Sequence, residues 1–191
     1  MRRAIVAISL ILMCLSLQAQ DHDYTYLDWS PLGTNTPGWK LGIGGIAIGC
    51  ADAVGCPDGM NAKMGKSIEL SWLSVMGVRY VTPDLRHRFL LGAGVNWRNY
   101  RFEDDTHLGV FSLTVPALYR YKIHGRWGVF AGPVINFNLH AKNAHQTTTT
   151  LDLMGGVNFS AVAWYVRYSP CHVLSKGPEF TSFSTGISFF L

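Results

Sequence analysis

Apolar and polar residues alternate with a period of two along most of the chain after residue 38. In segment 108–122, Phe111 and Leu113 lie on one face, while Ser112 and Thr114 lie on the other. A period of two is typical of a β-strand with one apolar and one polar face. The pattern recurs in eight segments: 39–49, 68–80, 89–98, 108–122, 127–139, 151–158, 162–169 and 182–191. Because no helical period separates these segments, we expect neighbouring strands to pair antiparallel.

The connections between the predicted strands alternate in length. The long ones are residues 50–66, 140–149 and 170–179, and the short ones are residues 82–87, 123–126 and 158–160. Outer-membrane barrels have short periplasmic turns and longer outer loops. We therefore predict an all-β fold, an eight-stranded antiparallel up-and-down transmembrane β-barrel with both chain ends on the periplasmic side.

Alternation alone does not say which face meets water, but the composition favours an apolar exterior. Only 15% of the residues are charged, against about 25% in an average soluble domain. The polar faces carry many Gly, Ser, Thr and Asn residues, which suit a narrow lumen, and aromatic residues gather near the strand ends, as in membrane barrels. The alternative is a soluble periplasmic lipocalin-like binding barrel with its polar face outward.

The first residues predict a targeting segment. Arg2 and Arg3 precede the apolar stretch 4–17, whose 14 residues are interrupted only by two serines. This stretch is shorter than the roughly 20 residues of a membrane-spanning helix, but it suits the core of a signal peptide. We predict a cleaved signal peptide at 1–19 and a periplasmic segment at 20–38 that forms a tail, a plug or an extra strand. The barrel then occupies 39–191.

The inward faces of the predicted strands carry a few charged residues. An eight-stranded barrel is only wide enough to be filled by side chains, and buried charges need partners. We therefore predict an internal salt-bridge network rather than an ion path. Its predicted members are Glu69, Arg79, Arg98, Arg120, Asp152 and Arg167.

The cysteine pattern is compatible with one disulfide. Cys50 and Cys56 flank a short loop that contains Gly55, and a disulfide between them suits an oxidising compartment. Cys171 is left over, so the pairing stays open.

Several motifs resemble the small outer-membrane β-barrels common in Bacteroidota, the PorT-like and OmpX-like group. They are LTVPALYRY at 113–121, FAGP at 130–133, WYVRYSP at 164–170 and the closing TGISFFL at 185–191. The resemblance covers roughly residues 39–191 and implies a location in the cell outer membrane. It also implies that the C-terminal strand is read by the barrel-assembly machinery, although the last residue is Leu191 rather than Phe. That group has no shared catalytic residues that could be carried over.

The sequence predicts the location of the protein better than its role. We expect outer-membrane lipid as a partner, an extracellular ligand as a candidate partner at the outer loops, and no nucleic acid, because the net charge is only +4. We identify no catalytic, cofactor-binding or metal-binding residues. The expected role is structural or surface interaction without catalysis. The alternatives are a transport- or secretion-accessory barrel and an envelope lipid-modifying enzyme.

Overall fold

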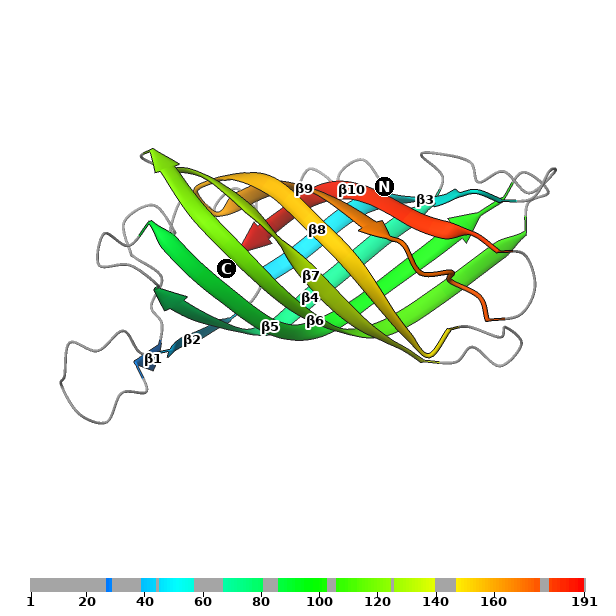
Figure 1. Ribbon diagram of the computed structural model, residues 1–191, viewed down its shortest axis with the longest axis horizontal. Helices are drawn as coiled ribbons and strands as arrows, with labels where there is room; N and C mark the ends of the chain where they lie inside the picture. The colour runs from blue at the N-terminus through cyan, green and yellow to red at the C-terminus, as the bar shows by residue number, and fades with distance from the viewer. Residues whose placement is uncertain are drawn as a thin grey trace, which may run out of the picture.

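All regular elements described in the computed structural model are β-strands (Figure 1). The described residues are 27–28, 39–43, 45–56, 67–80, 86–102, 106–124, 126–139, 147–175 and 179–190. The strands are β1 (Leu27–Asp28), β2 (Trp39–Ile43), β3 (Gly45–Val54), β4 (Ile68–Tyr80), β5 (His87–Arg101), β6 (His107–His124), β7 (Trp127–Leu139), β8 (Thr149–Phe159), β9 (Val162–Ser169) and β10 (Thr181–Phe190). The described part of the chain contains no helix that is long and apolar enough to cross a membrane.

Strands β3 to β10 close into a barrel. Each of these strands pairs antiparallel with the next one, and β10 returns to pair with β3. This last pairing runs from Thr181 opposite Val54 to Phe190 opposite Gly45. The predicted eight-stranded antiparallel barrel is thereby confirmed.

The N-terminal part of the barrel differs in detail from the prediction. The predicted strand 39–49 is divided into β2 and β3, which pair with β4 in one register, with Ile43 opposite Val75 and Ile46 opposite Trp72. The two residues of β1 pair with β2, so part of segment 20–38 forms an extra strand. The remainder of that segment and the predicted signal peptide lie outside the described residues.

Connections of different length gather at opposite ends of the barrel. At one end, which we call the short-turn end, residues 81–86, 125–126 and 160–161 join β4 to β5, β6 to β7 and β8 to β9. At the other, the long-loop end, the connections are residues 55–67, 102–106, 140–148 and 170–180. Three connections at the long-loop end are longer than every connection at the short-turn end, as predicted, whereas 102–106 is shorter than 81–86.

A register shift interrupts the pairing of β4 with β5. Leu73 lies opposite Gly94, whereas Val75 lies opposite Ala93, so Ser74 is an extra residue on β4. An extra residue of this kind is a β-bulge, and it exchanges the two faces of the strand beyond it. Arg79, on the short-turn side of Ser74, therefore does not follow the alternation that begins at Ile68.

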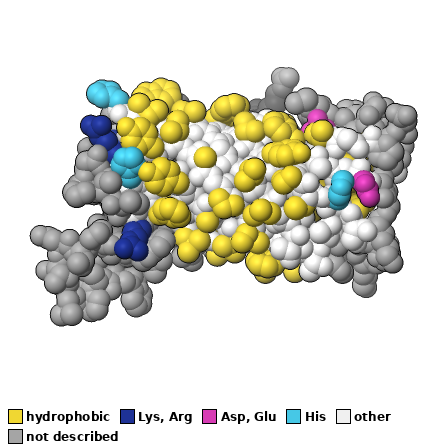
Figure 2. Space-filling view, viewed as in Figure 1, with side chains coloured by type: hydrophobic (Ala, Val, Ile, Leu, Met, Phe, Trp, Pro, Cys, Tyr) yellow, Lys and Arg dark blue, Asp and Glu magenta, His cyan; other side chains and the backbone are white. Residues whose placement is uncertain are grey.

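The apolar residues lie mainly on the outside of the barrel. Large apolar side chains are exposed on every strand from β3 to β10, from 37% for Val129 to 56% for Trp72. In Figure 2 they form a band across the middle of the visible face. The opposite faces of the strands are buried and largely polar, as Asn96, Ser112 and Asn136 illustrate. This distribution is the inverse of that in a soluble barrel.

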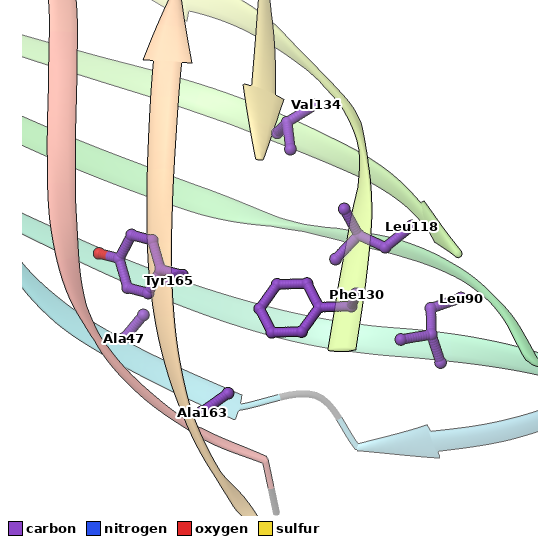
Figure 3. Packing of buried hydrophobic residues seen from close by; sticks show 7 residues of the cluster. All are labelled: Ala47, Leu90, Leu118, Phe130, Val134, Ala163 and Tyr165. Carbon is purple, nitrogen blue, oxygen red and sulfur yellow. The ribbon is translucent and has the colours of Figure 1, made fainter. Parts of the chain in front are cut away.

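The interior is filled in layers. Toward the short-turn end lies an inner apolar cluster, whose members point into the interior in Figure 3: Ala47, Leu90, Leu118, Phe130, Val134, Ala163 and Tyr165. Toward the long-loop end lies a second group, the mouth cluster: Ala51, Tyr100, Phe102, Val110, Val173 and Phe180. A polar layer separates the two clusters.

Candidate functional site

Four charged side chains in the polar layer form a closed ring of ion pairs, which we call the ionic ring. They are Glu69 of β4, Arg98 of β5, Asp152 of β8 and Arg167 of β9. Arg98 Nε lies 3.3 Å from Glu69 Oε1, and Arg98 Nη2 lies 2.6 Å from Asp152 Oδ2. Arg167 Nη1 lies 3.1 Å from Glu69 Oε1, and Arg167 Nε lies 2.6 Å from Asp152 Oδ2. Each arginine bridges both carboxylates, and the two charges of each sign balance.

Uncharged side chains add hydrogen bonds to Glu69 and Arg167 of the ring, whereas Asp152 Oδ1 is buried without a hydrogen-bond partner. Asn96 Nδ2 donates to Glu69 Oε1 over 2.6 Å, and Tyr165 Oη donates to Glu69 Oε2 over 3.3 Å. Arg167 Nη2 donates to Asn136 Oδ1. Both oxygens of Glu69 are therefore engaged, as is required when a carboxylate is removed from water.

The ionic ring connects opposite walls of the barrel. Strands β4 and β5 are neighbours, β8 and β9 are neighbours, and two or more strands separate the pairs on either side. Glu69 and Asp152 are fully buried, at 0% exposure. Breaking a buried ion pair leaves an uncompensated charge and costs about 3–5 kcal/mol. The arrangement is therefore a structural brace between these walls.

Four of the six predicted network residues meet in the ring, and two do not. The prediction for Arg79 is wrong: it is exposed and lies opposite Phe89, which is also exposed. The cause is the extra residue Ser74, which turns Arg79 from the inward to the outward face. Arg120 is half-buried near Gly128, toward the short-turn end, and lies outside the ring.

Sequence reasoning did not single out the neutral members of the site. Asn96 and Asn136 share the inward faces of β5 and β7, so the alternation places them correctly. What alternation does not give is their height along the barrel, which depends on the stagger between strands. An inward-facing Asn close in sequence to an inward-facing charged residue is the sequence signal that could have identified Asn96, which lies beside Arg98 on the same face.

The mouth cluster closes the long-loop end above the ring. Phe180 packs edge to face against Tyr100 and Phe102, with ring centroids 5.6 and 5.8 Å apart. The backbone of Val173 donates to the Phe180 carbonyl over 3.1 Å and accepts from the Thr147 amide over 3.0 Å. The connection from β9 to β10 is thereby held over the barrel interior.

A cavity of about 50 Å³ lies between the ring and the inner apolar cluster. Its walls are mainly apolar, and Leu73, Leu118 and Met154 are examples. Arg167 and Tyr165 border it, so the ring limits the cavity on one side. A water molecule needs about 10–15 Å³ of such space, so the cavity is sized for a few small molecules rather than for a long acyl chain.

Cys50 is a free, exposed cysteine in the structure, whereas Cys56 packs partly buried against the mouth cluster. The pairing of the cysteines, which the sequence leaves open, stays a prediction. Among the residues that the structure describes, no three or more His, Cys, Asp or Glu side chains are grouped to hold a metal ion.

Comparisons with family models, with curated proteins and with solved structures find no match for this chain. The resemblance to the small Bacteroidota barrels therefore rests on the sequence motifs alone.

Proposed function

We propose that this protein is an integral outer-membrane β-barrel with a structural or surface-interaction role and without catalysis. The observation that carries the proposal is the placement of the faces: a closed barrel exposes its large apolar side chains and buries its polar ones. A membrane barrel has this organisation because lipid surrounds it and its lumen is polar.

The energetic argument weighs against a soluble barrel. Burying a large apolar side chain contributes about 1.5–3 kcal/mol, so leaving the outward set in water forfeits on the order of tens of kcal/mol. The net stability of a folded domain is only about 5–15 kcal/mol. A lipocalin-like barrel needs a polar exterior, which the outward faces of β3 to β10 do not provide.

Aromatic side chains border the apolar band at both ends. Toward the short-turn end, the exposed aromatic residues are Phe89, Tyr119, Trp127 and Phe159, and toward the long-loop end they are Trp97, Phe111, Phe137 and Tyr168. Aromatic girdles at two water interfaces are a mark of membrane barrels. The positions of these aromatic members within the exposed apolar set support the same proposal.

The filled interior favours a structural role over transport. The inner apolar cluster, the ionic ring and the mouth cluster lie one above another along the barrel axis, and the four charged groups of the ring pair with one another. We therefore assign surface interaction to the long-loop end and propose the barrel-assembly machinery as the partner that recognises β10.

Cell fractionation of the full chain tests the proposal. We expect the protein to sediment with the outer membrane, and we expect the unheated sample to migrate faster on a denaturing gel than the boiled one, because a closed barrel resists detergent. A protein recovered in the soluble periplasmic fraction, with no shift on heating, contradicts the proposal.

A further inference from the structure

Exposed cationic side chains gather on one side of the short-turn end. We call them the basic sector: Arg79, Arg86, Lys122, His124 and Arg126. They belong to the ends and turns of β4 to β7. The backbone joins them closely, since the Lys122 amide donates to the Arg86 carbonyl over 2.8 Å. The described turn between β8 and β9, residues 159–162, carries no charge.

Apart from Asp28 of β1, the acidic residues that the structure describes lie elsewhere. Glu69 and Asp152 are buried in the ionic ring, while Asp52 and Glu179 lie toward the long-loop end. In Figure 2 the Lys and Arg side chains of the visible face lie at one end of the apolar band, with His side chains beside them, while another His lies at the opposite end next to an acidic side chain. The described surface of the basic sector is thus a concentration of positive charge.

The basic sector is continuous with the aromatic edge of the apolar band. His87 lies between Tyr119 and Tyr121, with ring centroids 5.9 and 4.9 Å apart, and Phe89 packs edge to face on Tyr119 at 6.0 Å. Arg79 lies opposite Phe89 in the sheet. Cations placed directly beyond an apolar band lie at the depth where lipid phosphates are found.

We propose that the basic sector binds the phosphate groups of anionic phospholipids in the leaflet at the short-turn end. Guanidinium groups pair with phosphate oxygens through two parallel hydrogen bonds. A phosphatidylglycerol headgroup offers such a phosphate with a net negative charge, whereas choline neutralises the phosphate of phosphatidylcholine. This inference rests on the proposed function, because it requires the apolar band to lie in a bilayer.

Electron spin resonance of spin-labelled lipids tests the two proposals separately. The full chain is refolded into phosphatidylcholine vesicles that contain traces of labelled phosphatidylcholine or labelled phosphatidylglycerol. Lipids in contact with a membrane barrel give a motionally restricted signal. We expect that signal with both labels, stronger for phosphatidylglycerol by about two- to fivefold in relative association constant. In about 1 M NaCl, where the Debye length is roughly 3 Å, the preference should disappear.

The variants locate the preference. The triple variant Arg79→Gln, Lys122→Gln, Arg126→Gln should lose the preference for phosphatidylglycerol but still give the motionally restricted signal. The single variant Arg79→Gln should weaken the preference. Arg120→Gln is its matched control, since it also removes one positive charge at the same end but from a half-buried side chain, and it should keep the preference.

Each outcome separates the proposals. Two results contradict lipid binding by the basic sector but are compatible with a membrane barrel. One is a restricted signal without a preference for phosphatidylglycerol, and the other is a preference that persists in the triple variant. No restricted signal with either label overturns both. If the triple variant does not refold, salt sensitivity of the unmodified chain and the single variant Arg79→Gln decide the question.

Discussion

At the scale of single residues, the ionic ring makes each of its members dependent on the others. Glu69 accepts from both arginines, and so does Asp152. Removing one carboxylate leaves two guanidinium groups with a single counter-charge in a buried site. The loss in the free energy of unfolding therefore exceeds the contribution of one hydrogen bond, which is about 1 kcal/mol.

We expect Asp152→Asn to lower the free energy of unfolding by about 3–5 kcal/mol, because it leaves buried positive charge without a partner. Urea titration of the barrel refolded into vesicles measures the change. Arg120→Gln should cost less than about 1 kcal/mol, since Arg120 is half-buried and lies outside the ring. Equal losses in the two variants contradict the special role of the ring.

Glycine is required where two strands approach closely. A Cβ atom at Gly132 would lie 2.2 Å from the Ala117 carbonyl oxygen, whereas at Gly155 the nearest atom would be the Phe130 carbonyl oxygen at 3.5 Å. We expect Gly132→Ala to destabilise the barrel by about 1–3 kcal/mol through overpacking, and Gly155→Ala to change stability by less than about 0.5 kcal/mol. The same urea titration checks both, and a tolerated Gly132→Ala argues against the close approach.

At the scale of the strands, the identity of the outward face can be tested by placing a charge on it. Leu153, near the middle of β8, is 55% exposed, and Ile123, near the end of β6, is 51% exposed. In a bilayer, arginine costs about 2–4 kcal/mol at the midplane and about 0–1 kcal/mol near the interface. Leu153→Arg should therefore lose far more stability than Ile123→Arg in a vesicle refolding titration. In a soluble barrel both positions face water, so similar small effects would point to that alternative.

The alternation of the sequence predicted the eight strands because each has one face in the barrel interior. It also placed Glu69, Arg98, Asp152 and Arg167 on inward faces, where they meet. It failed for Arg79, since one extra residue at Ser74 reverses the phase of β4, and a bulge leaves no mark in the pattern of apolar residues.

The mouth cluster shows a second limit of the sequence pattern. Val173 and Phe180 come from the connection between β9 and β10, where no period of two applies. Tyr100 lies on the inward face of β5. The predicted strand ended at Arg98, whereas β5 continues to Arg101 and so includes Tyr100. Loop residues that fold over a barrel are positioned by tertiary contacts, and the local sequence does not encode these.

At the scale of the whole molecule, the stacked layers predict a barrel without a pore. We expect the purified protein in a planar bilayer to show no steady, ion-selective current, because the ionic ring and the mouth cluster fill the lumen at successive heights. Small transient openings are compatible with side-chain motion, and a known porin in the same bilayer is the positive control. A stable current of porin size would favour the transport alternative over a structural role.

Closing the barrel brings together residues that are far apart in the chain. Arg167 meets Glu69 across 98 positions, and β3 meets β10 only when the last strand has been added. Contacts between such distant positions slow folding. A slip of one residue in the pairing of β8 turns Asp152 to the outside of the barrel and leaves the two arginines of the ring with a single carboxylate. The ionic ring therefore favours the correct alignment of β4, β5, β8 and β9 over misaligned closures of the barrel.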